Sequence, residues 1–220
     1  MRRLLEAPTI YRLFHYLIGT SQLYRTFVRD YLSPRPQARV LDVGCGPGNL
    51  LEFLPSDVNY VGVDISADYI REAHRRFPRR GKFTLCDAAL LSELELESKF
   101  DFVVAVGVLH HLDDQQVHAF LRGVTRHLTA EGKFVSVDPL LFEGQSRIAR
   151  FITLKDRGEF VRTALQYRAL FTRAACCVKH ESVVCGLVRI PYTHIIFQVD
   201  TKKEANTLLA SPEKSLNRVG

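Results

Sequence analysis

The chain has 220 residues, of which 46% are apolar and 25% are charged, as in ordinary folded domains. This balance excludes intrinsic disorder, a collagen-like repeat and a disulfide-stabilised miniprotein. The net charge is +6, and basic residues gather in 1–39, 71–82 and 139–175 while the remainder is net acidic. Such blocks suit an anionic substrate, a nucleic acid or a membrane surface, and equally a solvated arginine-rich surface.

In chain order, residues 9–32 have the apolar period of a helix. Gly19-Thr20-Ser21 is expected to break it in two, with Ser21 or Thr20 capping the second part. Strands are predicted at 39–43, 60–63, 82–86, 100–109 and 133–137. They alternate with a short helix ending near Pro55 and with helices at 67–77 and 113–128, the last opening on an Asp113–Gln116 capping box. This alternation predicts parallel pairing in an open, doubly wound sheet.

The second half of the chain departs from this rhythm. Residues 139–175 are arginine-rich and partly helical, and we interpret them as an insertion over one edge of the sheet. Strands at 178–188 and 192–199, joined through Pro191, predict an antiparallel hairpin. We therefore expect a single domain over 1–200 and a polar tail over 201–220. Within the domain we expect N-terminal helices (1–37), a cofactor-binding core (38–138), a substrate-side insertion (139–175) and a C-terminal hairpin (176–200).

Cysteine usage and the N-terminus indicate the compartment. The five cysteines form no CxxC pair, so neither a zinc site nor a disulfide framework is predicted. They are Cys45, Cys86, Cys176, Cys177 and Cys185. Arg12 and His15 interrupt the apolar N-terminal stretch, so we predict no signal peptide or membrane span. A cytoplasmic location is expected.

A glycine-rich turn is the strongest functional signal. In VLDVGCGPGN, residues 40–49, a strand runs into the turn that opens the next helical segment. Gly44 and Gly46 let the backbone approach a ligand, and free N–H groups at a helix start favour a negative group. Asp64 ends the second strand, where a carboxylate can accept from both hydroxyls of a ribose. The alternative is that Asp64 is a helix-capping or turn residue. Asn49 stands where a dinucleotide fingerprint requires its third small residue, so NAD is disfavoured.

VLDVGCGPGN, YVGVDIS, FTLCDA and FDFVVAVGVLHHLDD, in this order, resemble the successive motifs of class I S-adenosylmethionine-dependent methyltransferases. The resemblance covers roughly 38–140, and the hairpin also fits. It implies a Rossmann-like sheet of seven strands in the order 3-2-1-4-5-7-6, with strand 7 antiparallel. S-adenosylmethionine is the implied cofactor and S-adenosylhomocysteine the product; no metal is predicted.

The resemblance also implies a cofactor-binding set. Gly44, Cys45 and Gly46 would line the methionine part, and Asp42 would anchor its amino end. Asp64 would hold the ribose, Ile65 would pack on the adenine, and Asp87 with Ala88 would meet the adenine amino group. Val106 would supply a backbone contact to the methionine moiety.

The catalytic candidates follow the fourth and fifth strands. His110 or His111 could deprotonate an acceptor hydroxyl, and Asp138 is a further candidate base. The alternative is that one histidine packs or caps the next helix while the other is solvated. Asp113 and Asp114 are better explained as helix N-terminal residues.

Substrate contacts are expected from the N-terminal helices and the insertion. The candidates for an apolar lid, each of which could instead face the core, are Tyr11, Phe14, Tyr24, Phe151, Phe160 and Tyr167. The candidates for binding an acceptor carboxylate or phosphate, each of which could instead be solvated or ion-paired, are Arg147, Arg150, Arg157 and Arg162.

The predicted function is methyl transfer to an O, N or C atom of a small molecule. The Asp/Asn-Pro-Pro-Tyr motif of base-amino methylation is absent after strand four, so nucleic acid is not favoured as acceptor. Two alternatives stay open: an RNA or protein methyltransferase recruited through the basic blocks, and a non-catalytic S-adenosylmethionine-binding protein. Nothing in the sequence predicts the oligomeric state.

Overall fold

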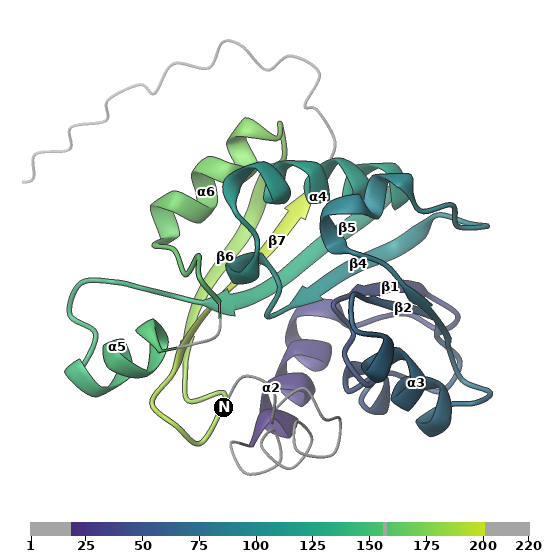
Figure 1. The fold of residues 1–220 in the computed structure, drawn as a ribbon, viewed down its shortest axis with the longest axis horizontal. Coiled ribbons are helices and arrows are strands. Elements are labelled where there is room, and N and C mark those ends of the chain that lie inside the picture. Colours follow the sequence, from purple (N-terminus) through teal and green to yellow (C-terminus); the bar gives the residue numbers. More distant parts are fainter. Residues whose placement is uncertain (1–18, 156–157, 201–220) are drawn as a thin grey trace, which may run out of the picture.

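Seven strands form one mixed sheet in the order β3-β2-β1-β4-β5-β7-β6 (Figure 1). The structure is a computed structural model, and it describes residues 19–155 and 158–200. β1 to β5 are parallel to one another, and β7 runs antiparallel to both β5 and β6. The predicted strand order and hairpin are confirmed. The strands are β1 (Arg39–Val43), β2 (Asn59–Asp64), β3 (Lys82–Leu85), β4 (Phe100–Val106), β5 (Leu128–Pro139), β6 (Cys177–Cys185) and β7 (Thr193–Asp200).

Helices cover both faces of the sheet (Figure 1). α4 (Asp114–His127) and α6 (Ala164–Arg173) lie on one face, and α2 (Thr20–Thr26) and α3 (Ala67–Arg76) lie on the other. The central strand β4 is buried on both sides, with Val103, Val104 and Ala105 wholly inaccessible. This explains its uninterrupted apolar sequence.

The helix ends follow local capping chemistry in most places. Asp113 and Gln116 form the predicted capping box at the start of α4. The predicted cap of α2 is wrong: left-handed Gly19 takes that position, without a side-chain hydrogen bond. α2 continues into a π-helical turn at Phe27–Leu32. The predicted helix over 9–18 and the tail over 201–220 lie outside the described residues.

Three predicted boundaries are also wrong. The short helix after the glycine turn is only a 3-10 turn, Leu50–Glu52. β4 ends at Val106, because left-handed Gly107 turns the chain and donates to the Val137 carbonyl at 2.7 Å. β5 starts early, at Leu128, through an irregular pairing with Phe100.

The insertion between β5 and β6 contains α5 (Arg147–Leu154) and α6. Contrary to the sequence prediction, α6 packs on the sheet face and not over an edge. Its Tyr167 and Phe171 are fully buried, with ring centroids 6.0 and 5.0 Å from that of Phe197 on β7. Tyr167 is therefore a core residue and not a lid. α5 lies at the periphery with sparse contacts to other elements (Figure 1).

Candidate functional site

The glycine turn after β1 has the backbone conformation that its glycines predict. Gly44, Gly46 and Gly48 all have positive φ, at 74°, 54° and 79°. A Cβ on Gly44 would lie 2.5 Å from Val108 Cγ2, so no other residue fits there without displacement. Gly44 N–H donates to the Val63 carbonyl at 2.8 Å, which fixes the turn against the end of β2.

Asp64 connects this turn to the end of β2. Its Oδ2 accepts from Gly46 N–H at 2.8 Å, and its Oδ1 accepts from Ser66 N–H at 2.8 Å. Burial raises the pKa of Asp64, and the backbone donors Ser66, Gly46 and Ile65 oppose the rise. The sequence analysis predicted that Asp64 binds a ligand, and the structure shows that its carboxylate also accepts hydrogen bonds from the backbone of the glycine turn and of Ser66.

Apolar and acidic groups continue along the same edge of the sheet. Ile65, next to Asp64, has 68% of its surface exposed. Asp87 follows β3 and its Oδ1 accepts from Ala89 N–H at 2.9 Å, capping the short 3-10 helix that Ala88 begins. Val106 ends β4, half-buried, beside the Gly107 turn. Because β1 to β4 are parallel, these groups share the carboxyl edge where open α/β sheets bind ligands.

Asp42 is buried beneath the turn and is paired. Tyr60 Oη donates to Asp42 Oδ2 at 2.6 Å. Burial raises the pKa of Asp42 to about 7, which the Tyr60 hydrogen bond opposes and the nearby Asp64 reinforces. The sequence analysis missed Tyr60. Its position in β2, two residues from the register partner of Asp42, is the diagonal at which long side chains meet across strands.

The side chain of Cys45 points into the core. It is 5% exposed, and a Cβ on Gly62 would lie 2.8 Å from its Sγ. Burial raises the pKa of the Cys45 thiol well above its usual value, so it stays protonated and acts as a small apolar group. The prediction that Cys45 lines the cofactor can therefore apply only to its main chain.

Asn49, which departs from the dinucleotide pattern, has a structural contact. Its side chain accepts from Arg76 Nη1 at 2.9 Å, which ties α3 to the glycine turn. Tyr24, a lid candidate, is buried and stacks on Phe53 with centroids 5.7 Å apart.

Two catalytic candidates, His110 and Asp138, form one pair. His110 Nδ1 lies 3.0 Å from Asp138 Oδ1, which also accepts from the His110 main-chain N–H at 3.2 Å. Both residues are buried, and Asp138 Oδ2 has no hydrogen-bond partner within the described part of the chain. Burial raises the pKa of Asp138, and His110 opposes this rise. His111 is exposed and its ring centroid lies 4.1 Å from that of His110.

Residues 158–162 pass directly over this pair. Phe160 N–H donates to the His110 carbonyl at 3.0 Å, and a Cβ on Gly158 would lie 1.9 Å from His110 Cδ2. The sequence analysis missed Gly158; a lone glycine in an arginine-rich stretch was the available signal. The 158–162 segment therefore separates the ring of His110 from solvent.

Arg162 is not the acceptor-binding group that the sequence suggested. It is 6% exposed, and its guanidinium donates to the Leu109 and Leu112 carbonyls at 2.9 and 2.8 Å and to Asp114 at 2.8 Å. These bonds fix the turn that carries His110. Arg147, Arg150, Phe151 and Phe160 remain exposed, whereas Tyr11, Phe14 and Arg157 lie outside the described residues.

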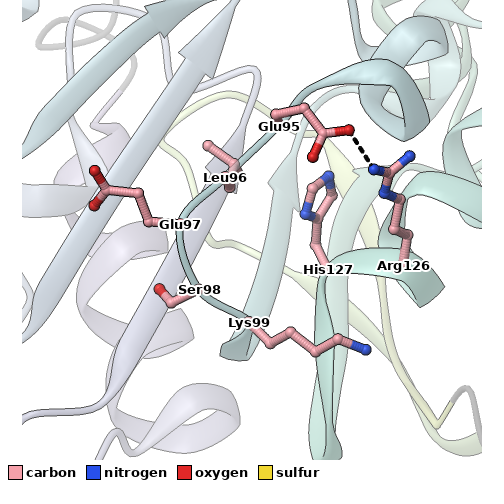
Figure 2. A pocket seen from close by; sticks show the side chains of 7 residues that line it. All are labelled: Glu95, Leu96, Glu97, Ser98, Lys99, Arg126 and His127. Atoms are coloured by element: carbon pink, nitrogen blue, oxygen red, sulfur yellow. Dashed lines mark hydrogen bonds and ion pairs between the residues drawn. The ribbon is translucent and has the colours of Figure 1, made fainter.

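A depression of about 400 Å³ lies elsewhere (Figure 2). It is lined by Glu95, Leu96, Glu97, Ser98, Lys99, Arg126 and His127. Arg126 is ion-paired with Glu95 across it, and His127 Nε2 lies 3.0 Å from the Leu91 carbonyl oxygen. These residues precede β4 and β5, so the depression lies at the sheet edge opposite to the glycine turn. Glu95, Glu97 and Arg126 are ion-paired, and the depression lies away from the glycine turn, so it forms no part of the candidate site.

The described ranges contain no cluster of three or more His, Cys, Asp or Glu side chains arranged to hold a metal ion. Over the same ranges, no helix is long and apolar enough to cross a membrane.

Comparison with known proteins shows which family the central part of the chain resembles. Residues 41–134 match the family model of a methyltransferase domain. The chain is 34% identical over 123 residues to the cyclopropane-fatty-acyl-phospholipid synthase of Escherichia coli strain K12, an alignment that covers 54% of this chain and 31% of that enzyme. Over 56 residues it is 45% identical to the trans-aconitate 2-methyltransferase of Afipia carboxidovorans, covering 23% of this chain and 22% of that protein. The matched part thus spans less than a third of either relative.

Solved structures share the whole fold. A mitomycin 7-O-methyltransferase superposes with a TM-score of 0.67 and 19% identity, covering 89% of this chain and 59% of the other. A glycopeptide N-methyltransferase gives a TM-score of 0.64 and 17% identity, covering 85% and 92% of the two chains. The matching methyltransferase-domain model over residues 41–134, the strand order and the glycine turn at the carboxyl edge agree: this chain is similar to the class I S-adenosylmethionine-dependent methyltransferases and shares their fold.

Proposed function

We propose that the chain binds S-adenosylmethionine and transfers its methyl group to an O, N or C atom of a small-molecule acceptor. The observation that carries this proposal is the hydrogen bond that joins Asp64 to the glycine turn. The carboxylate and the left-handed Gly46 are joined by a 2.8 Å hydrogen bond at the carboxyl edge of the sheet.

The residues at this edge fit the cofactor. A carboxylate offers about four acceptor positions. The backbone N–H groups of Gly46 and Ser66 each take one position, on different oxygens of Asp64, and the carboxylate keeps acceptor capacity for a ribose hydroxyl. The exposed Ile65 offers an apolar surface for the adenine ring, and Asp87 with Ala88 follows on the neighbouring strand.

The methionine part would lie over the turn itself. The main chain of Gly44, Cys45, Gly46 and Val106 would line it. Asp42 beneath the turn would supply the negative charge that a cofactor ammonium group requires. An ammonium group favours the ionised carboxylate, so its arrival would return the raised pKa of Asp42 toward the ordinary value.

When bound, S-adenosylmethionine supplies a methyl group activated by its attachment to a positively charged sulfur, and S-adenosylhomocysteine is the product. The chain then has mainly to align the acceptor and exclude water. A base is required only where the acceptor atom must lose a proton.

His110 is the proposed base, with Asp138 as its positioning residue and His111 beside it as the exposed second candidate. Asp138 Oδ1, 3.0 Å from Nδ1, would orient the ring and stabilise the imidazolium that forms when His110 takes a proton. The 158–162 segment covers this ring and would border the acceptor there.

The named relatives support a small acceptor, since they include enzymes named for trans-aconitate and mitomycin. The Asp/Asn-Pro-Pro-Tyr motif is absent after β4, where residues 107–110 read Gly-Val-Leu-His. Nucleic acid is therefore not the acceptor that we propose. The proposed location is cytoplasmic.

Thermal unfolding with S-adenosylmethionine, S-adenosylhomocysteine or NAD tests the cofactor. A ligand at 100 times its Kd adds about 2.7 kcal/mol, which raises the Tm of a chain of this size by roughly 5–11 °C. We expect this shift from the two sulfur ligands and none from NAD. Asp64→Asn should weaken binding of both roughly 10- to 100-fold, because a charge-assisted hydrogen bond is lost. Stabilisation by NAD alone would overturn the proposal.

Transfer is then measured with radiolabelled S-adenosylmethionine against a panel of small hydroxyl, amine and carboxylate acceptors, with tRNA and total protein as comparison arms. Label appearing in a small acceptor supports the proposal. Label appearing only in RNA or protein would replace the acceptor class while leaving the cofactor assignment intact. Binding without transfer to any arm would identify a non-catalytic binding protein.

A further inference from the structure

Helix α5 exposes three large apolar side chains to solvent. Ile148, Phe151 and Leu154 have 67%, 61% and 59% of their surfaces exposed. Their spacing of three residues places them along one side of the helix. Ala149 and Thr153, on the other side, are the buried residues. Figure 1 shows α5 at the periphery of the molecule.

The same exposed side carries three cations. Arg147, Arg150 and Lys155 are exposed, and none has an ion-pair partner among residues 19–155 and 158–200. The only acid between Asp138 and Lys155 is Glu143.

Most arginines of the other helices have acidic partners. Arginines on α3 pair with Asp68, Glu72 and Glu52, Arg126 on α4 pairs with Glu95, and Arg168 on α6 pairs with Glu181. Arg25 on α2 and Arg122 on α4 have no ion pair among the described residues, but these two helices bury their large apolar side chains. α5 alone of these helices combines cations without an ion pair in the described ranges with a stripe of three exposed large apolar side chains. Exposed apolar patches of this kind mark interaction surfaces.

Local bonds hold α5 in this orientation. Ser146 Oγ caps the helix by accepting from Ala149 N–H at 3.1 Å. Gln145 Nε2 donates to Thr153 Oγ1 at 3.2 Å and to the Leu140 carbonyl at 3.4 Å. The inner side of α5 is anchored, so its outer side is the one left to meet a partner.

Charge decides what that partner is. Residues 1–18 carry three arginines and one glutamate, and 201–220 carry four basic and two acidic residues. Both terminal segments are net positive, and so is a second copy of α5. Repulsion between like charges therefore disfavours all three as the partner that binds the exposed side of α5. The partner of α5 must therefore be anionic, and it must also bury the apolar side chains of one short helix. An anionic phospholipid surface provides both, with phosphates for the cations and an acyl boundary for the apolar stripe.

We propose that α5 docks the chain peripherally on anionic phospholipid membranes, inserting Ile148, Phe151 and Leu154 while Arg147, Arg150 and Lys155 bind lipid phosphates. This goes beyond the proposed methyl transfer and does not depend on it.

Vesicle co-sedimentation of the full 220-residue chain tests the docking. We expect binding to mixed phosphatidylcholine–phosphatidylglycerol vesicles and little to phosphatidylcholine alone. Arg147→Gln with Arg150→Gln and Lys155→Gln should weaken binding about a hundredfold, at about fivefold for each cation. Arg71→Gln with Arg75→Gln and Lys82→Gln removes the same charge from ion-paired sites, and should weaken binding far less. Ile148→Ser with Phe151→Ser should weaken it roughly tenfold or more.

Tryptophan fluorescence supplies an independent readout, because the chain has no tryptophan. Phe151→Trp places a single reporter on the exposed side of α5, and we expect its emission to shift to the blue on anionic vesicles. Val183→Trp, exposed on β6, is the control and should not shift. Equal thermal unfolding of all variants verifies folding.

Three results would each overturn the proposal. They are no binding to anionic vesicles, equal binding to neutral vesicles, and unchanged binding by both sets of α5 variants. The last would assign membrane binding to another part of the chain. Absence of vesicle binding would leave an acidic protein as the partner of α5.

Discussion

Gly158 lies against the imidazole of His110 at a distance that only glycine permits. A Cβ on Gly158 would lie 1.9 Å from His110 Cδ2 and 2.6 Å from the His110 carbonyl oxygen. The neighbouring Phe160 N–H donates to that same carbonyl. A residue remote in sequence thus determines how closely the 158–162 segment closes over the candidate base.

Gly158→Ala should lift this segment or displace His110. Overpacking of this kind costs about 1–3 kcal/mol, which corresponds to a Tm lower by roughly 2–12 °C. Methyl transfer should fall while S-adenosylhomocysteine binding is kept, because the glycine turn is not touched. Gly144→Asn, in open space with a left-handed backbone that asparagine tolerates, is the matched control. If Gly158→Ala kept the Tm and the activity of the wild type, the contact between residue 158 and His110 would not require glycine.

The buried Asp42 predicts a specific pH dependence of stability. Its folded pKa of about 7 lies above the ordinary value of 3.8, so the folded state holds this proton more tightly. Stability from this group is therefore complete below about pH 4 and is lost as the pH rises through 7. The loss is on the order of 4 kcal/mol.

Asp42→Asn should abolish this dependence. Asparagine still accepts from Tyr60 Oη but has no proton to release. Urea unfolding at pH 5 and pH 8 should show the wild-type chain losing stability relative to Asp42→Asn. Tyr60→Phe should move the wild-type transition to higher pH, because it removes the bond that lowers the pKa of Asp42. Parallel stability curves for the wild type and Asp42→Asn would contradict the raised pKa.

Asp42→Asn should at the same time weaken binding of S-adenosylmethionine, if Asp42 balances its ammonium group. Calorimetric titration at pH 8 measures this. A charge-assisted interaction of about 1.5–3 kcal/mol corresponds to a Kd roughly 10- to 100-fold larger. Unchanged affinity would remove Asp42 from the cofactor site and leave it a structural role with Tyr60.

The His110–Asp138 pair predicts how catalysis should fail. His110→Ala should lower kcat by about 10²- to 10⁴-fold for an acceptor that must lose a proton, with little change in cofactor affinity. Asp138→Asn should lower kcat less and alter its pH profile, because the carboxylate orients the ring without touching the acceptor. His111→Ala is the neighbouring comparison. A His110→Ala variant that retains kcat but loses stability would assign the pair to structure alone.

Arg162 and Arg150 should differ in their effect on stability, because Arg162 is buried and Arg150 is exposed. Arg162→Ala should destabilise the fold by about 2–6 kcal/mol, because the carbonyls of Leu109 and Leu112 lose their donor inside the protein and each unsatisfied acceptor costs about 1–3 kcal/mol. Arg162→Lys should rescue only part of this, since one ammonium cannot span the same acceptors. Arg150→Gln, on the exposed side of α5, should leave Tm unchanged. Chemical unfolding of the three variants checks the order, and equal stability for all of them would refute the structural role of Arg162.

The sequence by itself determined the sheet. Apolar strands of the length seen at β4, alternating with amphipathic helices, leave few arrangements other than a parallel doubly wound sheet, and Pro191 marked the hairpin. The glycine turn and Asp64 were also readable, because their roles depend on backbone conformation and strand ends, which local sequence encodes. The predicted ends of the elements were less accurate. Gly107 ends β4 earlier than predicted, and β5 starts earlier than predicted through an irregular pairing.

Only the tertiary structure decided which side chains meet. His110 and Asp138 were separate candidates until parallel pairing of β4 and β5 placed them side by side. Tyr60 donates a hydrogen bond to Asp42, and Gly158 packs against the ring of His110. Arg162, a candidate for binding an acceptor anion, is instead buried and donates to the carbonyls of Leu109 and Leu112. Such partnerships join residues many positions apart, and their energies come from burial and hydrogen bonding that exist only after the chain has packed.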